Sequence, residues 1–407
     1  MIVELRLTLE DVEQSRYFEV PFEVNSPNAR VGVTMTYDHS EGAAIDLGLL
    51  DPDGIRGWSG GERSTYVVTQ TASTPGYRPG PMSPGRWAVL LGLYRVPADG
   101  VPVTVTIDTA TTDEPESEAP GPAPRVTDRG SARAHPAPAG MTWFAGDMHA
   151  HTVHSDGSQS IAQLAALATG MALDFVAVAD HNTVSHHPLL AEQAARYDIS
   201  LLPAQEVTTL YGHANVFGDV GQVDFRTPPD EWRIQAASRG GLMSVNHPLE
   251  DDCGWLHPMA ELPPALELWH IGWFRNLTDN KPWALTRRWP RFPIVIGGSD
   301  FHKPESGYPP GVPTTWVAAE DRSPEAILEG VKAGRTAINR MAAARSALLL
   351  PVDGELLALD ADGSTLVGPS GRMRAVRGDS VLFTPQEPGI HRLETPVKRE
   401  VLGICVT

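Results

Sequence analysis

The stretch Gly146-Asp147-Met148-His149-Ala150-His151-Thr152, which continues to His154-Ser155-Asp156-Gly157, indicates how the chain is organised. It follows Thr142-Trp143-Phe144-Ala145, an apolar run typical of a buried strand. Because side chains alternate along an extended segment, His149 and His151 point to the same side. If the strand ends here, both imidazoles project beyond its end, where they are placed to bind a metal ion.

The same pattern, an apolar run that ends in His, Asp or Glu, recurs downstream. We predict nine metal ligands on this basis: His149, His151, Asp156, His181, Glu206, His213, His247, Asp300 and His302. Imidazoles and carboxylates together suit Zn²⁺, Mn²⁺ or Fe²⁺ better than Ca²⁺ or Mg²⁺ alone. Since nine ligands exceed what one ion needs, two or three divalent ions are expected.

Changes in composition divide the chain into four regions. Residues 1–109 contain short alternating strands separated by Gly/Pro turns, which predicts a β-sandwich-like domain. Residues 110–140 form a Pro/Ala/Glu-rich linker with few apolar anchors. Residues 141–340 alternate strands with helices, and residues 341–407 return to short β segments. This β-rich C-terminal segment is expected either to form a small terminal domain or to rejoin the N-terminal sandwich.

The region 141–340 has the pattern of repeated β-α units. Leu173–Asp180 is a continuous apolar run, as in a parallel strand that is buried on both faces. Tyr211–Gly218 is expected to be a further strand that carries a histidine. Ligand-type residues at the carboxyl ends of such strands predict an α/β barrel whose active face is that end. The expected helices are 160–169, 188–197, 229–238, 282–289 and 323–333.

Bulk properties exclude several classes of protein. The formal net charge of −18 argues against a nucleic-acid scaffold, which would need a basic face. The chain lacks an apolar run long enough to span a membrane, and its N-terminus lacks the core of a signal peptide, so a cytoplasmic location is expected. Cys253 and Cys405 form neither a disulfide framework nor a metal knuckle, and we interpret them as incidental.

The ordered motifs resemble the polymerase-and-histidinol-phosphatase (PHP) superfamily of metal-dependent hydrolases. They are His149-x-His151, Ser155-Asp156-Gly157, Asp180-His181, Glu206, Asn246-His247-Pro248 and Ser299-Asp300-x-His302. The resemblance covers roughly Trp143 to Arg340, about half of the chain. The β domain, with Gly57–Gly60 and Ala72–Gly85, resembles the N-terminal region of the CehA/McbA-type branch, which includes carbamate-ester hydrolases.

The resemblance implies a distorted (β/α)7 barrel that holds up to three metal ions. The implied ligands of the first ion are His149, His151, Glu206 and Asp300. Glu206 would bridge to a second ion held by His213 and His247, and Asp156, His181 and His302 would hold the third. Asp156 stands where some members have a histidine, so the third site is expected to be weaker or to select a different ion. A metal-bridging hydroxide would then attack the substrate.

Further residues are assigned roles by their positions near the ligands. Glu206, Asp300 and His270, another residue at a strand end, are the predicted catalytic residues. Asp147, Asp180 and Asn246 are adjacent to ligands and are expected either to orient imidazoles or to cap a helix or turn. The candidate substrate-binding residues are Lys303, Arg275 and His187.

These expectations lead to a metal-dependent hydrolase with three alternatives for its activity. The first is a phosphoesterase that acts on a small anionic ester, because divalent ions would leave the site net positive. The second is a carboxylic or carbamic ester hydrolase on the same metal site. The third is a non-catalytic, metal-stabilised binding module. The β domain is expected either to cover the barrel mouth or to form the contact of a homo-oligomer.

Overall fold

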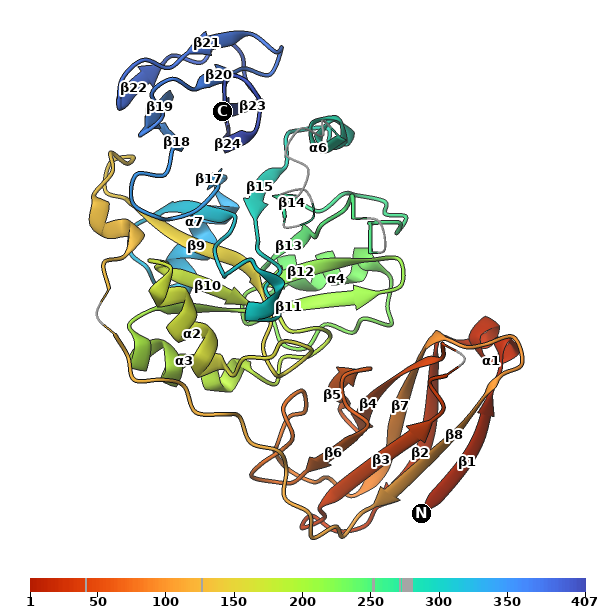
Figure 1. The fold of residues 1–407 in the computed structure, drawn as a ribbon. Coiled ribbons are helices and arrows are strands. Elements are labelled where there is room, and N and C mark those ends of the chain that lie inside the picture. The colour runs from red at the N-terminus through yellow and green to blue at the C-terminus, as the bar shows by residue number, and fades with distance from the viewer. Residues whose placement is uncertain (41, 126, 251–252, 271, 273–280) are drawn as a thin grey trace.

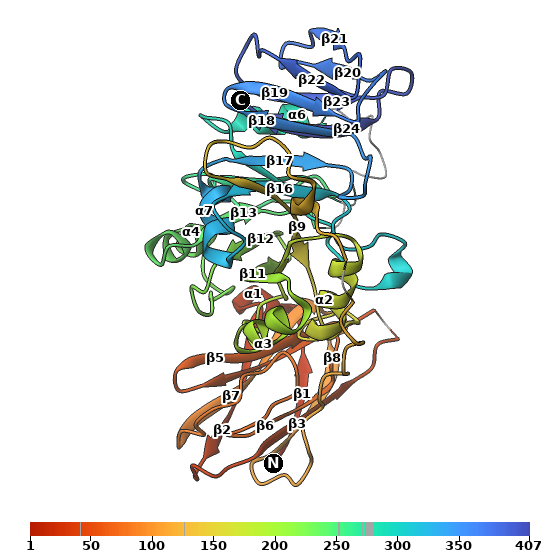
Figure 2. The same cartoon turned by 90° about the vertical axis from the view of Figure 1, so that its left-hand side faces the viewer.

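The computed structural model describes residues 1–407 except 41, 126, 251–252, 271 and 273–280. The molecule is elongated, with the N-terminal strands at one end, an α/β region in the middle and the C-terminal strands at the other end (Figures 1 and 2). The structure is therefore mixed α/β with extensive sheets, in agreement with the predicted α/β class.

The strands between residues 2 and 108 form two four-stranded antiparallel sheets, with the orders β1-β8-β3-β6 and β2-β7-β4-β5, and we refer to them together as the β domain. Alternating apolar side chains of both sheets, such as Val33 and Leu47, share one buried cluster. The strands are β1 (Ile2–Leu7), β2 (Tyr17–Val24), β3 (Val31–Tyr37), β4 (Ala44–Asp51), β5 (Gly54–Gly60), β6 (Thr65–Val68), β7 (Gly85–Arg95) and β8 (Val101–Asp108). The short helix α1 (Leu9–Gln14) was not expected; Thr8 and Asp11 cap it reciprocally.

The linker, residues 110–140, runs along the α/β region with little regular structure in its described part. It contains the 3₁₀ turn η1 (Gly130–Arg133). Glu118 accepts a hydrogen bond at 3.0 Å from His154, and the Tyr197 hydroxyl donates to the Pro122 carbonyl at 2.7 Å. The linker therefore binds the α/β region through specific polar contacts.

The α/β region is organised around a strongly curved sheet. Its strands are β9 (Thr142–Ala150), β10 (Phe175–Val178), β11 (Ser200–Thr209), β12 (Gly212–Phe217), β13 (Leu242–Val245), β14 (Ala265–Trp269), β15 (Ile294–Gly297), β16 (Thr314–Ala319) and β17 (Thr336–Asn339). The strands β9, β10 and β11 are parallel, and so are β13, β14 and β15. The bridge between Ala150 and Phe301 brings the two ends of this series together.

The expected series of parallel β-α units is interrupted at β12, which is antiparallel to both β11 and β13. The cause is the connection of Leu210 and Tyr211 between the paired residues Thr209 and Gly212. Two residues suffice for an antiparallel hairpin, whereas a parallel crossover needs a dozen or more. Since β12 runs in reverse, its first residues lie at the same edge as the carboxyl end of β11.

The described helices that follow the linker lie close to the expected positions. They are α2 (Ile161–Gly170), α3 (His187–Tyr197), α4 (Pro229–Ser238), α6 (Lys281–Leu285) and α7 (Pro324–Lys332), with the 3₁₀ turns η2 (Thr286–Arg288) and η3 (Pro304–Ser306). Ser160 and Gln163 form a capping box at the start of α2, and Ser323 caps α7. The helix expected at 282–289 is shorter, because α6 passes into η2.

Part of the C-terminal segment extends the sheet of the α/β region. The segment contains β18 (Leu348–Val352), β19 (Glu355–Leu359), β20 (Thr365–Val367), β21 (Met373–Ala375), β22 (Ser380–Phe383), β23 (Ile390–Glu394) and β24 (Val401–Val406). Three of these strands form a small sheet of their own, in the order β18-β19-β22. Strand β24 pairs with β17 in antiparallel register. The alternative that this segment rejoins the N-terminal sandwich was wrong, because it pairs with the edge strand β17 at the opposite end of the molecule (Figure 1).

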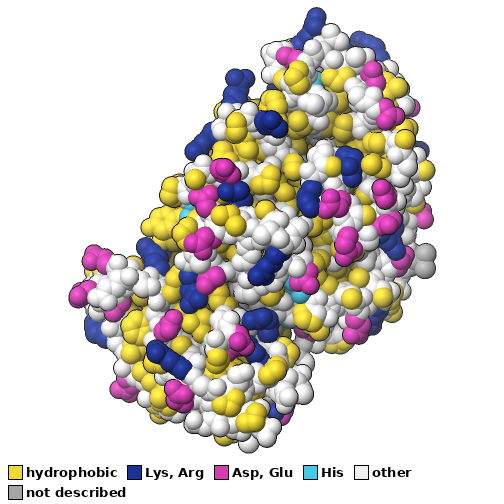
Figure 3. Space-filling view, turned by 180° about the vertical axis from the view of Figure 1, so that it is seen from behind, with side chains coloured by type: hydrophobic (Ala, Val, Ile, Leu, Met, Phe, Trp, Pro, Cys, Tyr) yellow, Lys and Arg dark blue, Asp and Glu magenta, His cyan; other side chains and the backbone are white. Residues whose placement is uncertain are grey.

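One face of the molecule carries acidic and basic side chains that are intermixed over its length (Figure 3). The net charge of −18 therefore does not gather into a single acidic field on that face. Among the described residues, no helix has the length and apolar character needed to cross a membrane.

Candidate metal centre

The predicted ligands converge at the carboxyl edge of the curved sheet. His149 lies in β9 and His151 follows it, while His181 comes after β10 and Glu206 lies in β11. His213 lies at the start of the reversed strand β12. The remaining donors follow β9, β13 and β15: Asp156, His247, Asp300 and His302. The sheet thus brings together residues that are up to 153 positions apart in the sequence (302 minus 149).

Glu206 lies at the middle of this cluster and is fully buried. Its two carboxylate oxygens face imidazoles from both sides of the edge. The shortest nitrogen–oxygen distances are 2.8 Å to His181, 3.2 Å to His247, 3.3 Å to His149, 3.3 Å to His213 and 3.5 Å to His151. This one carboxylate therefore has the position of a bridging ligand.

The inner group consists of His149, Glu206, His247 and Asp300. The Nε2 atom of His149 lies 3.3 Å from Glu206 Oε1 and 3.3 Å from Asp300 Oδ1. The potential donor atoms of His149, His247 and Asp300 all lie within 4.8 Å of one another. The residues His247 and Asp300 have positive φ angles of 23° and 51°, a strained conformation that turns their side chains at the strand ends.

The outer group consists of His151, Asp156, His181 and His302. Asp156 Oδ1 lies 3.3 Å from His302 Nε2 and 3.5 Å from His181 Nε2. The ring of His151 lies close to the rings of both His181 and His302, at centroid distances of 4.3 and 4.2 Å, and those two rings are 5.8 Å apart. The side chains of Asp156 and His302 are 40% and 28% exposed, against 22% for Asp300, the most exposed of the acidic residues in the inner group, so the outer group is the more open to solvent.

The electrostatic surroundings favour carboxylates in their ligand form. Burial would raise the pKa of Glu206, but His149, His181 and His213 lower it well below its ordinary value. Burial likewise opposes ionisation of Asp300, yet His149 and His151 hold its pKa well below the ordinary value. Both carboxyl groups are therefore anionic at neutral pH.

The donor set fits divalent metal ions. Within the described part of the chain, Glu206 Oε2 and His213 Nδ1 are buried without a well-aligned hydrogen bond, and they face other ligand atoms, His181 Nδ1 at 2.8 Å and Glu206 Oε1 at 3.3 Å. An ion held between such atoms would satisfy them. The Nε2 atoms of His149 and His151 face each other at 3.0 Å, and two protonated nitrogens cannot share that space. Imidazoles and carboxylates bind Zn²⁺ at about 2.0–2.2 Å, so donors about 3 Å apart can share one ion.

Comparison with known proteins gives limited similarity. No protein-family model matches the chain, and no curated protein matches it. Among solved structures, the chain is similar to a two-domain protein from Bacteroides vulgatus containing a predicted PHP-like metal-dependent phosphoesterase. The two are 18% identical, with 71% of this chain and 91% of that one covered and a TM-score of 0.38.

Two further solved structures are similar to parts of the chain. One is a candidate metal-dependent phosphoesterase from Bifidobacterium adolescentis, 17% identical over 40% of this chain and 89% of that one, with a TM-score of 0.30. The other is an amidohydrolase from Chromobacterium violaceum with bound sulfate and no metal, 17% identical over 49% of this chain and 98% of that one, with a TM-score of 0.32. At such scores the function has to be argued from the cluster itself.

Three buried polar residues next to the ligands hold the cluster in different ways. Asn246 donates from its amide to Glu206 Oε1 at 2.8 Å. Asp147 accepts from the backbone N–H groups of His149 and Ser299, both at 3.0 Å, so it fixes the two strand ends instead of an imidazole ring. Asp180 accepts from the backbone and hydroxyl of Thr152 at 2.8 and 2.7 Å, which braces the segment leading to Asp156.

Glu267 is a buried residue of the site that the sequence analysis missed. Its Oε1 atom lies 3.0 Å from His149 Nδ1, and its Oε2 atom accepts the backbone N–H of His247 at 2.8 Å. A carboxylate that binds the far nitrogen of an imidazole fixes the ring and its tautomer for a metal ion. The available signal was a single acidic residue inside the apolar strand Ala265–Trp269.

Cys253 also belongs to this region, in contrast to the interpretation that it is incidental. Its Sγ atom lies 3.3 Å from His247 Nδ1, and the donor atoms of His213, His247 and Cys253 lie within 4.8 Å of one another. Cys405 is buried in β24, away from the centre.

The remaining candidate residues are less central. His270 is buried behind His247, at a ring distance of 6.2 Å. Lys303 is exposed immediately after His302. His187 lies at the start of α3, where its Nε2 atom is 3.0 Å from the Ala204 carbonyl and its Nδ1 atom is 3.4 Å from Asp219. Arg275 lies outside the described residues.

Proposed function

We propose that the chain is a divalent-metal-dependent hydrolase of the PHP type that acts on a small ester. The observation that carries this proposal is the position of Glu206, a buried carboxylate that faces imidazoles of both the inner and the outer group. A bridging carboxylate between ions a few ångströms apart is the arrangement that hydrolytic multinuclear sites use. Two or three ions are proposed, of the Zn²⁺, Mn²⁺ or Fe²⁺ class.

The bound ions would supply Lewis acidity and a water of lowered pKa. The protein's own contribution is to hold the donors in place. Glu267 fixes the ring of His149, and Asn246 fixes the carboxylate of Glu206. His151, which lies near donors of both groups, would link the inner and outer ions. We retain His270 as a proposed proton-transfer residue, with Glu206 and Asp300 as the residues closest to the reacting bond.

We propose a phosphoester as the first substrate class. Three acidic ligands, Asp156, Glu206 and Asp300, bring three negative charges, and two or three divalent ions outweigh them. Glu267 adds a fourth negative charge close to His149, which makes a two-ion centre neutral and a three-ion centre positive. Attraction of a phosphate therefore depends on the outer ion.

A carboxylic or carbamic ester is the second candidate substrate. Tyr17, Trp58 and Tyr94 line the cavity beside the outer group, and the acidic Asp46 and Glu62 lie near them. Aromatic walls with acidic neighbours favour an uncharged planar substrate over a multiply charged one. This composition accords with the sequence resemblance to the CehA/McbA-type branch, which remains part of the proposal.

The test is a substrate panel run on one metal-reconstituted sample of the full chain. It contains a phosphomonoester, a phosphodiester and an aryl methylcarbamate, each with the wild type and with Asp300→Ala. The proposal expects Asp300-dependent turnover of a phosphoester. Turnover of the carbamate alone would move the assignment to the second candidate, and equal background with both proteins would favour a non-catalytic binding module.

A further inference from the structure

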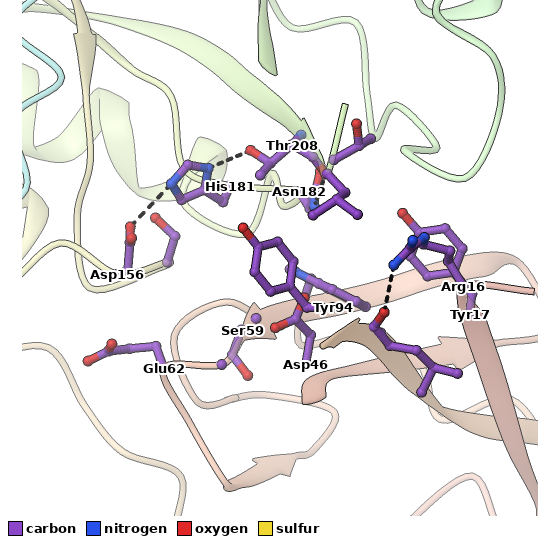
Figure 4. A pocket seen from close by; sticks show the side chains of 18 of the residues that line it. Arg16, Tyr17, Asp46, Ser59, Glu62, Tyr94, Asp156, His181, Asn182 and Thr208 are labelled. Carbon is purple, nitrogen blue, oxygen red and sulfur yellow. Dashed lines mark hydrogen bonds and ion pairs between the residues drawn. The ribbon is translucent and has the colours of Figure 1, made fainter. Parts of the chain in front are cut away.

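A cavity of about 390 Å³ lies between the β domain and the metal-binding edge of the α/β region. Asp156, His181 and His213 line one side of it, and Asp46, Trp58 and Tyr94 line the other. Figure 4 shows Asp46, Ser59 and Tyr94 facing His181 and Asp156 across this space. The outer group thus opens into a cavity to which the β domain contributes a wall.

The β-domain wall is packed firmly against the α/β region. Trp58 of β5 and Leu90 of β7 share a buried apolar cluster with Val207 of β11 and with Phe225. The ring of Phe225 lies 4.7 Å from the ring of Trp58 and 5.3 Å from that of Tyr17. Because these aromatic contacts join the two regions, the cavity is a built part of the structure.

Polar contacts tie the same domain to the segment that carries Asp156. The guanidinium of Arg63 donates to the carbonyl of Val153 at 2.8 Å and to that of Ser155 at 3.2 Å. The Thr183 hydroxyl donates to the Gly76 carbonyl at 2.8 Å. The β domain therefore positions the backbone on both sides of the outer group.

Asp46 is a half-buried acidic residue of the wall, whereas Glu62 on the same wall is exposed. Within the described part of the chain, its carboxylate makes no hydrogen bond or ion pair, and Arg16 instead donates to the Leu93 carbonyl at 3.2 Å. Burial raises the pKa of Asp46 to about 7, although His181 opposes this shift. Gly92 makes room for it, because a Cβ there would lie 2.9 Å from Asp46 Cβ and 2.7 Å from Trp58 Cη2.

We propose that the β domain binds the leaving group of the substrate and that Asp46 selects leaving groups in which a planar apolar frame carries an N–H or O–H donor. This assignment rests on the proposed function, because that function places the ester bond at the metal centre.

Two physical arguments lead to this chemistry. The faces and edges of Tyr17, Trp58 and Tyr94 suit a planar apolar group. A ligand without a donor would cover the Asp46 carboxylate and leave it without a hydrogen bond, which costs binding free energy. A site of this kind therefore discriminates strongly between ligands that differ in one polar group. Asp46 would therefore determine specificity, while the metal ligands determine the reaction.

The test measures binding of the released alcohol, which requires no hydrolysis. Calorimetry on the metal-loaded full chain, at a pH well above the pKa of Asp46, would compare 4-(aminomethyl)phenol, 4-(hydroxymethyl)phenol and 4-methylphenol. The three compounds share the phenolic oxygen, which the proposed function places at the metal ions, and differ only in whether the opposite end of the ring carries a donor. We expect both donor-bearing phenols to bind about ten- to a hundredfold more tightly than 4-methylphenol, the value of one hydrogen bond to a charged group. Asp46→Ala should remove this preference and leave the affinity for 4-methylphenol within about twofold.

Two further variants guard against a folding defect. Asp46→Asn keeps an acceptor oxygen, so it should weaken the aminomethyl compound and retain the hydroxymethyl compound. Asp53→Asn changes an exposed acid in the β4–β5 turn and should alter neither affinity. Equal affinities of the three phenols in the wild type, or an unchanged preference in Asp46→Ala, would overturn the proposal.

Ester turnover separates this proposal from the proposed function. Discrimination among the phenols without turnover of any ester would retain the β-domain site and reject the hydrolase. Turnover without discrimination would retain the hydrolase and reject the role of Asp46.

Discussion

The inner and outer groups of the metal centre use the same kinds of donor, but the protein holds them differently. Glu267 and Asn246 bind His149 and Glu206 from behind, and all four residues are buried. In the outer group, the side chains of Asp156 and His302 are 40% and 28% exposed, and Asp156 lines the cavity. The comparison suggests a preorganised inner site that retains its ion and an outer site that exchanges ions and meets the substrate.

The largest effect is expected where the two groups meet. Glu206→Gln removes the charge that both groups share, so it should lower turnover by on the order of a thousandfold. This corresponds to a rise of about 4 kcal/mol in the activation free energy. Steady-state kinetics would measure this. The matched control is Glu320→Gln, an exposed acid after β16, which should retain wild-type turnover. Turnover of Glu206→Gln within tenfold of the wild type would contradict a bridging role.

The second prediction concerns the inner group alone. Glu267→Gln keeps the size of the side chain but removes the anionic partner of His149, so metal affinity should fall about ten- to a hundredfold. Competition with a chromogenic chelator would measure the affinity. An unchanged metal affinity would show that Glu267 only fills space in the core. The inner group would then not be preorganised by this residue, in contrast to our interpretation.

The third prediction concerns the outer group. Asp156→Asn should weaken the binding of one ion by about tenfold, which is the contribution of one contact to a charged group. The affinity of the tightest ion should stay unchanged. Metal titration followed by elemental analysis would resolve the two classes of ion. If all ions weaken together, the two groups form a single site and the comparison fails.

The smallest effect is expected outside both groups. The ring of His187 faces the Ala204 carbonyl and Asp219 instead of the cavity, so His187→Ala should leave turnover within about twofold. Loss of its hydrogen bonds should lower the free energy of unfolding by about 1 kcal/mol. Denaturant titration and kinetics on one preparation would separate these effects. A large rise in KM would indicate instead that His187 contacts the substrate.

The convergence at one sheet edge could be predicted from sequence because its signals are local. Each apolar run ends at a donor, and parallel neighbours place such ends together, as with His181 and Glu206. The reversal of β12 was not predicted, although its two-residue connection to β11 is too short for a parallel crossover.

Other features depend on contacts between distant segments. Glu267 lies inside a strand instead of at its end, so its pattern is that of a core residue. The pairing of β24 with β17 joins residues more than 60 positions apart, such as Ala337 and Cys405. The cavity forms because Trp58 packs on Phe225. These residues are far apart in the sequence, and the local pattern around either one does not predict the contact.

We propose that this edge of the sheet holds a multinuclear metal centre bridged by Glu206. Elemental analysis of the full chain after reconstitution and dialysis, with the wild type and Glu206→Gln in parallel, tests this proposal. We expect two or three transition-metal ions per chain in the wild type and a clear loss in Glu206→Gln. Less than one ion per chain in the wild type, or the same content in both proteins, would contradict it.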